Sequence, residues 1–107
     1  MPNRICLVQT SVEYPDQARS LGEKLLAERL AACIQIIPDG TSMFHWQGRV
    51  EQSSECYLSI KTRLELRDAV IRWLEVHHPY EMPEIVSTEL QSTAAYTAWL
   101  KAETRPA

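Results

Sequence analysis

The apolar positions of the first thirty residues predict a strand followed by a helix. Residues 4–12 contain the short apolar run Ile5-Cys6-Leu7-Val8, which fits a buried strand. A proline at the first position of a helix gives up only an amide that has no partner there, so Pro15 favours a helix start. Apolar residues then recur at spacings of three, four and seven, which predicts a helix from about Pro15 to Leu30.

A long hairpin is predicted over residues 33–61. The run from Cys33 to Ile37 reads as a strand, and Pro38-Asp39-Gly40 interrupts it with residues that favour a bend or bulge. Extended structure resumes at Thr41, Gln47-Gly48-Arg49 supplies a turn, and residues 56–61 alternate cleanly. The two strands make a hairpin longer than a small sheet needs.

A second helix is predicted after the hairpin. Thr62-Arg63-Leu64-Glu65 matches a capping box. Helical spacing then places one apolar stripe on Leu66, Ala69, Val70, Trp73, Leu74 and His77. Pro79 ends this helix, and residues 84–90 alternate as a fourth strand. Thr93 is placed to cap a last short helix, after which residues 104–107 are expected to fray.

The order β-α-β-β-α-β with an added helix predicts an α+β fold. Right-handed crossovers fold two strand-helix-strand units into an antiparallel sheet with both helices on one face, the ferredoxin-like sandwich. The other face would be bare apart from the last helix, so we expect a homo-oligomer. We find no Pro/Gly/Ser-rich linker, so residues 1–107 are expected to form one domain.

Composition narrows the functions. The 107 residues carry a formal net charge of −3 with scattered Lys and Arg, so nucleic acid is not an expected partner. No run approaches the roughly 18 apolar residues of a membrane span, and the N-terminal apolar run is too short for a signal peptide, which favours a cytoplasmic protein without a membrane partner. The spacing of Cys6, Cys33 and Cys56 favours reduced thiols.

Sequence motifs give no support to an enzyme. The chain lacks the common nucleophile, metalloprotease and nucleotide-binding motifs, and three glycines are too few for a glycine-rich nucleotide loop. Cys33 or Cys56 with a histidine would give a nucleophile and base, but no spacing supports such a pair. Cys33 is more typical of a small buried apolar residue.

The chemically richest segment is the end of the second helix and the loop that follows. His77, His78, Tyr80, Glu81 and Glu84 bring imidazole, phenol and carboxylate together. Imidazole is a good ligand for copper or zinc, but neighbouring helical residues point about 100° apart, so His77 and His78 need a donor from elsewhere to chelate one ion. The structural alternative is that His77 closes the apolar stripe and His78 caps the last helical carbonyls.

Two further features bear on a ligand site. Pro79 and Pro83 bracket Tyr80-Glu81-Met82 and stiffen this loop, which suits either a binding site or a tight connector. Lys61, at the end of the third strand, would neutralise an anionic ligand or pair with Glu55 or Glu81.

An ordered set of short motifs resembles the CutA family of divalent-cation tolerance proteins. The motifs are Ala31-Ala32-Cys33, Trp46-Gln47-Gly48, Lys61-Thr62, His77-His78-Pro79-Tyr80-Glu81-Met82-Pro83-Glu84 and Tyr96-x-x-Trp99-Leu100. The resemblance spans nearly everything from Leu7 to Leu100. It implies a ferredoxin-like fold in a homotrimer similar to the PII signalling proteins, with the long hairpins pairing between subunits.

The resemblance also implies a link to copper and other divalent ions. In some members a first-strand cysteine joins the paired histidines, whereas the matching position here is Gln9, and Cys6 lies on the opposite face of the strand. Two imidazoles and an amide bind Cu(I) more weakly than two imidazoles and a thiolate. His45 stands where the family more often has an aromatic residue.

Our leading hypothesis is a trimeric, non-enzymatic protein of divalent metal-ion tolerance with no obligatory cofactor. Copper or another divalent cation would bind in clefts between subunits, with His77 and His78 as metal ligands. The predicted ligand-binding residues are Cys33, Lys61, His78, Tyr80 and Glu81. The alternative is a PII-like signalling module that binds a small anionic metabolite at the subunit interface, an analogy made at the level of the fold.

Overall fold

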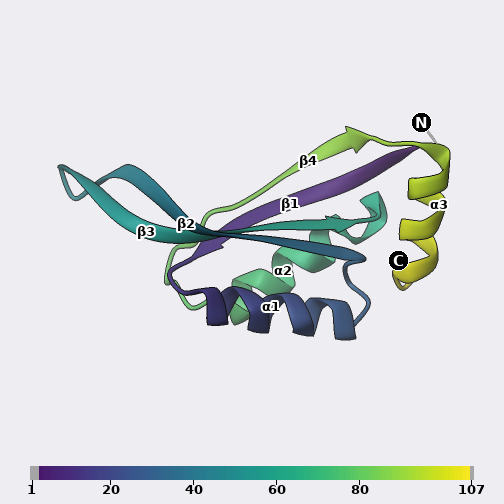
Figure 1. Ribbon diagram of the computed structural model, residues 1–107, viewed down its shortest axis with the longest axis horizontal. Coiled ribbons are helices and arrows are strands. Elements are labelled where there is room, and N and C mark those ends of the chain that lie inside the picture. The colour runs from purple at the N-terminus through teal and green to yellow at the C-terminus, as the bar shows by residue number, and fades with distance from the viewer. Residues whose placement is uncertain (1–2, 107) are drawn as a thin grey trace.

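The computed structural model describes residues 3–106, and its elements follow the predicted order (Figure 1). They are β1 (Arg4–Val12), α1 (Pro15–Ala27), β2 (Cys33–Trp46), β3 (Arg49–Thr62), the 3-10 turn η1 (Leu64–Leu66), α2 (Arg67–His77), β4 (Ile85–Gln91) and α3 (Ala94–Glu103). The strands form one antiparallel sheet in the order β2-β3-β1-β4. The predicted α+β, ferredoxin-like sandwich is confirmed.

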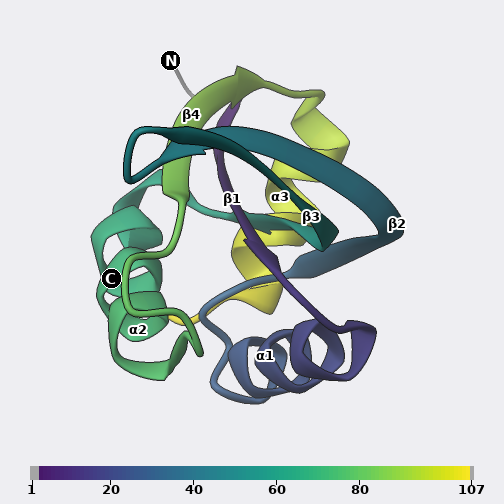
Figure 2. The same cartoon turned by 90° about the vertical axis from the view of Figure 1, so that its left-hand side faces the viewer.

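The core lies between the sheet and the helix pair α1 and α2, which lie side by side on one sheet face (Figures 1 and 2). Strand alternation directs Val8, Leu58 and Ile60 toward the helices, where all three are fully buried. Leu25 of α1 and Leu74 of α2 meet them and are also fully buried. Each such side chain contributes about 1.5–3 kcal/mol on burial, so this layer supplies most of the fold's stability.

The β2–β3 hairpin extends well beyond the two-layer body (Figure 1). Its strands stay paired to the Trp46–Arg49 end, with one register shift between Ile37 and Gly40. The shift is the predicted bulge. Gln47 and Gly48 both have positive φ angles, 50° and 80°, as a two-residue hairpin turn of the I′ type requires. The hairpin makes the molecule elongated, with a longest extent of 45 Å.

Two helix boundaries differ from the prediction. α1 ends at Ala27 instead of Leu30, because Arg29 takes a left-handed φ of 54° and the Leu30 amide turns back to the Leu25 carbonyl. α2 begins at Arg67, after η1, and Thr62 is not its cap. Thr62 lies buried in β3, where its Oγ1 donates a hydrogen bond to the Leu30 carbonyl at 2.6 Å.

The prediction that the chain frays from Thr104 is wrong for Thr104 and Arg105, and Ala107 lies outside the described residues. Thr104 is buried and accepts a hydrogen bond from Arg63 Nε at 3.0 Å. The Arg105 amide donates to the Arg29 carbonyl at 2.9 Å. The Arg105 bond fastens the end of α3 to the residues after α1, and the Thr104 bond fastens it to Arg63 between β3 and η1. Both are long-range contacts that the local sequence pattern does not predict.

Two buried threonines on neighbouring strands give a matched test of the sheet's polar contacts. Thr62→Val should lower the free energy of unfolding by about 1–3 kcal/mol, because it leaves the buried Leu30 carbonyl without its donor. Thr10→Val should not lower it and should raise it by up to about 1–3 kcal/mol, because Thr10 Oγ1 is buried without a hydrogen-bond partner among residues 3–106 and valine removes that unsatisfied hydroxyl. Urea denaturation at fixed protein concentration measures both, and equal losses would contradict this account.

Candidate functional site

His78 begins the loop between α2 and β4, and its side chain turns into the protein. It is the C-cap of α2, with its amide bonded to the Leu74 carbonyl, and it is 8% exposed. The imidazole Nε2 lies 2.9 Å from the Ser11 carbonyl, and Nδ1 accepts a hydrogen bond from the Tyr80 amide at 3.0 Å. Because a carbonyl oxygen only accepts, Nε2 carries the proton and the Nδ1 lone pair is occupied. The structural alternative predicted that the His78 side chain caps the last carbonyls of α2, and it does not do so.

A buried carboxylate continues this network. The Tyr80 hydroxyl donates to Glu55 Oε2 at 2.8 Å, and the Ser11 hydroxyl donates to Glu55 Oε1 at 3.3 Å. Burial, the hydrogen bond to Glu55 and its negative charge raise the pKa of Tyr80 well above its usual value. Burial lowers the pKa of His78 despite opposing effects of the Ser11 carbonyl and Glu55. At neutral pH the imidazole and the phenol are therefore both uncharged.

The hydrogen bonds form a closed ring that begins and ends at Ser11. It runs from the Ser11 carbonyl through His78, Tyr80 and Glu55 to the Ser11 hydroxyl. This ring ties the end of β1, the middle of β3 and the 78–84 loop together. Ser11 was not predicted as a site residue, and Glu55 was considered only as a partner of Lys61.

His77 has a different environment from its neighbour. Its ring is exposed at the end of α2 and stacks on Trp73, with ring centroids 4.0 Å apart and an interplanar angle of 15°. Its Nδ1 lies 2.8 Å from the Trp73 carbonyl and donates to it, which leaves the lone pair on Nε2. Nε2 has no hydrogen-bond partner among residues 3–106. His77 thus packs on the apolar stripe, as predicted, and still offers a metal-binding nitrogen.

Cys33 and Lys61 lie far from this network within one chain. They face each other in register on β2 and β3, on the sheet face opposite α1 and α2. Six residues of extended strand, about 20 Å, separate Lys61 from Glu55. The Lys61 ammonium donates to Gln35 Oε1 at 3.0 Å, so within one chain it is not paired with Glu55 or Glu81.

The predicted ligand-binding residues therefore form two groups in a single copy of the chain. Tyr80 and Glu81 lie in the loop with His78, and Glu81 is exposed. Half-buried Cys33 lies instead beside Tyr96 of α3, whose pKa is raised by burial and by the nearby thiol. A second copy would have to contribute before the two groups could share a cleft.

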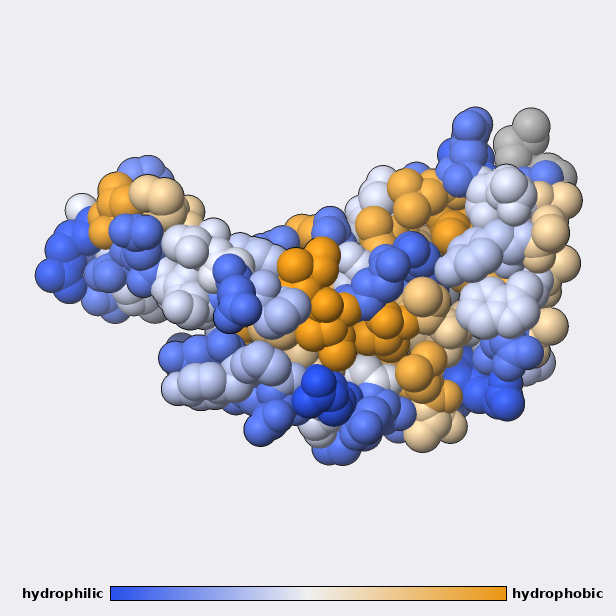
Figure 3. Space-filling model, viewed as in Figure 1, coloured by the Kyte–Doolittle hydropathy of each residue, from blue (hydrophilic) through white to orange (hydrophobic). Residues whose placement is uncertain are grey.

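An open groove of about 890 Å³ runs between the outer half of the hairpin and the 80–84 loop. We call it the acidic groove, because four glutamates and no Lys or Arg occur among the described residues that line it. These residues are Ser11, Ser42, Met43, Phe44, His45, Trp46, Glu51, Gln52, Ser53, Glu55, Tyr80, Glu81, Met82 and Glu84. His45, which sequence alone left unplaced, is thus opposite the loop. Figure 3 shows the hairpin standing away from the body, with apolar surface near its tip.

The side chains of one chain do not by themselves fit a transition-metal site. Zinc and copper sites in proteins use three or four converging donors. No group of three or more His, Cys, Asp or Glu side chains within residues 3–106 is placed to hold an ion. A site that includes His77 therefore needs donors from another copy.

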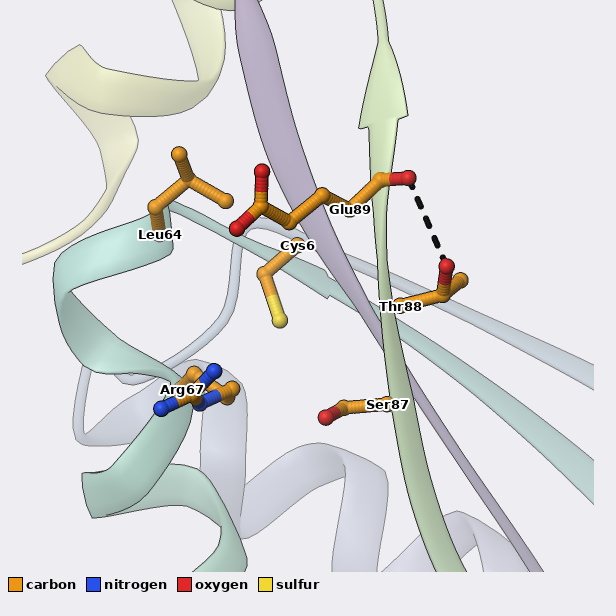
Figure 4. Close-up of a pocket in the computed structure, with 6 residues that line it drawn as sticks. All are labelled: Cys6, Leu64, Arg67, Ser87, Thr88 and Glu89. Carbon is orange, nitrogen blue, oxygen red and sulfur yellow. Dashed lines mark hydrogen bonds between the residues drawn. The ribbon is translucent and has the colours of Figure 1, made fainter.

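A second, smaller cavity of about 220 Å³ lies between β1, β4 and the start of α2 (Figure 4). The Cys6 thiol points into the space between Arg67 and Ser87. Burial raises the pKa of this thiol, which keeps it protonated. Cys6 lies on the helix-covered face and Gln9 on the opposite face, so Cys6 cannot stand in for a cysteine at the Gln9 position.

Comparisons with known proteins agree on one family. The sequence model described as "CutA1 divalent ion tolerance protein" matches residues 6–103. A divalent-cation tolerance protein CutA of Escherichia coli O139:H28 is 38% identical over 94 residues, which is 85% of this chain and 84% of the relative. CutA1 of Oryza sativa superposes with a TM-score of 0.93 at 31% identity, covering 97% of this chain and 96% of that one. The divalent cation tolerance protein (Cut A1) of Thermus thermophilus superposes with a TM-score of 0.89 at 33% identity, covering 94% of this chain and 99% of that one.

Proposed function

The chain belongs to the CutA1 divalent ion tolerance family, and on this basis we propose that it is a homotrimeric, non-enzymatic protein that binds a divalent cation, with copper as the first candidate. The cation would bind in clefts between subunits. The observation that carries this proposal is the exposed His77 imidazole, whose ring is fixed by Trp73 and whose Nε2 has no hydrogen-bond partner among residues 3–106.

The hairpin supports assembly into a trimer. Large apolar side chains are exposed on it, including Met43 at 68% and Val50 at 63%, with Phe44 and Trp46 more than two-fifths exposed. An apolar surface on a projecting hairpin is typical of a protein interface. We propose that the hairpins pair between copies and so bring the acidic groove of one subunit close to its neighbour.

The charge of the groove supports a cation over an anion. Glu51, Glu81 and Glu84 line it with the hydrogen-bonded Glu55, and His45 adds an imidazole. An anionic metabolite, as in the PII-like alternative, would meet like charge there. Lys61 is the basic residue among the predicted ligand-binding residues, and its ammonium donates a hydrogen bond to Gln35 on the sheet face opposite α1 and α2. We therefore rank the signalling module second.

Replacing His77 by alanine should weaken Cu(II) binding by roughly tenfold or more, because a nitrogen ligand is lost. Isothermal titration calorimetry on the assembled protein measures this. Val76→Ala is the control, since it truncates an exposed side chain next to His77 that carries no ligand atom and lies outside the groove lining, and it should leave the affinity unchanged. Equal affinity in the wild type and His77→Ala would reject His77 as a ligand.

We also propose that the protein works in the cytoplasm. Cys6, Cys33 and Cys56 are all free thiols, which suits a reducing compartment. No helix within residues 3–106 is long and apolar enough to cross a membrane.

A further inference from the structure

The adjacent histidines are not equivalent, because their nitrogens already have different partners. On His77, Nδ1 donates to the Trp73 carbonyl, which leaves the lone pair on Nε2 without a partner among residues 3–106. On His78 the proton on Nε2 goes to the Ser11 carbonyl, and the lone pair on Nδ1 receives the Tyr80 amide. A metal ion binds the lone pair of a neutral imidazole. For His78 to bind a metal ion, the ion would have to displace the Tyr80 amide from Nδ1. It would also have to reach a side chain that is only 8% exposed.

We infer that His78 is a positioning residue that fixes one wall of the acidic groove, and that it is not a metal ligand. The inference replaces the hypothesis that both histidines of the pair ligate an ion. The inference concerns the loop and holds whether or not the protein binds a metal. Only one part rests on the proposed function, namely that His77 is the histidine of the pair that binds the cation.

The positioning acts through two anchor points on the loop. His78 holds the Tyr80 amide, and Glu55 holds the Tyr80 hydroxyl. Both holders are themselves tied to Ser11 at the end of β1. Tyr80, Glu81, Met82 and Glu84 form the loop wall of the groove. With Tyr80 held at both ends, this wall keeps a fixed position relative to the hairpin wall, which extends from β3.

Three substitutions of His78 separate the two hydrogen bonds. His78→Asn keeps an acceptor near the position of Nδ1, as in an Asx turn, but does not reach Ser11. His78→Gln places an amide donor near the position of Nε2 and removes the local acceptor. His78→Ala removes both. We expect amide hydrogen exchange at Tyr80 to accelerate roughly tenfold in the Gln and Ala variants and to stay near the wild-type rate in the Asn variant.

A general loss of packing would accelerate Tyr80 exchange in all three variants alike. That result would overturn the inference, because rescue by asparagine is specific to the local acceptor.

Imidazole nitrogen resonances of the unmodified protein give a test that needs no variant. In ¹⁵N-labelled wild-type protein, His78 should show the tautomer with the proton on Nε2. Adding Zn(II), a diamagnetic probe, should move the His77 resonances and leave those of His78 in place. The opposite tautomer, or His78 resonances that move at the same Zn(II) concentration as those of His77, would overturn the inference. If no imidazole resonance moves, the proposed metal function fails while the Nε2–H tautomer still supports the positioning role.

Discussion

Replacing Gly40 by alanine should lower the free energy of unfolding by about 2–4 kcal/mol. A Cβ on Gly40 would overlap the ring of Tyr57, with the ring Cζ at only 2.8 Å. The ring must move, and its hydroxyl then loses its bonds to the Thr41 carbonyl and the Ser42 hydroxyl, both at 3.1 Å. Urea denaturation at fixed protein concentration measures the loss, because the stability of an oligomer depends on concentration.

Two controls isolate the clash with Tyr57. In a Tyr57→Ala background the Gly40→Ala substitution should lower the free energy of unfolding much less than in the wild type. The effects of the two substitutions on stability are therefore strongly non-additive. Gly48→Ala should lower the free energy of unfolding by about 1 kcal/mol from its φ of 80° alone, because no atom of residues 3–106 lies within 4 Å of the added Cβ. If the cost of Gly40→Ala is the same with and without the tyrosine ring, the close packing of Tyr57 on Gly40 does not stabilise the bulge.

The double substitution Phe44→Ser/Trp46→Ser should convert the proposed homotrimer to a monomer at micromolar concentration. Both side chains lie on the projecting hairpin, at 41% and 46% exposed, and truncating aromatic interface residues commonly costs about 2 kcal/mol or more each. Sedimentation velocity reports the mass directly.

The control for assembly is Val76→Ser. Val76 lies on α2 and is 78% exposed, more than any other large apolar side chain of residues 3–106. This variant should keep the wild-type mass if the hairpin forms the interface. A wild-type protein that sediments as one copy would refute the trimer proposal outright.

The elements of the fold were largely predictable because local patterns determine them. β1 and the start of α1 coincide with their predicted bounds, and the bulge after Ile37 follows from Pro38-Asp39-Gly40. Errors arose where a distant contact overrides a local signal. Thr62 looks like a helix cap in sequence, but its hydroxyl binds the carbonyl of Leu30, 32 residues earlier.

The site was less predictable than the fold for the same physical reason. The pattern His77-His78 suggests two equivalent ligands, yet their roles depend on Ser11, which lies 67 residues before His78. Glu55 is one position out of phase with the buried residues of β3, which marks it as facing the other side, but nothing local shows that Tyr80 covers it. Cys33 and Lys61 are predicted to share a cleft between subunits with the loop. Within one chain they lie in register on a distant part of the sheet, which follows from the topology and not from a local pattern.

The elongated shape has a practical consequence for labelling. β1 begins and α3 ends at the end of the body opposite the hairpin turn (Figure 1). Reporters fused to either terminus would thus project away from the acidic groove and the apolar hairpin. A donor dye at a terminus and an acceptor at the turn would be separated by a large part of the 45 Å long axis, within the working range of energy transfer. Such a pair would report any change in the distance between the hairpin turn and the body.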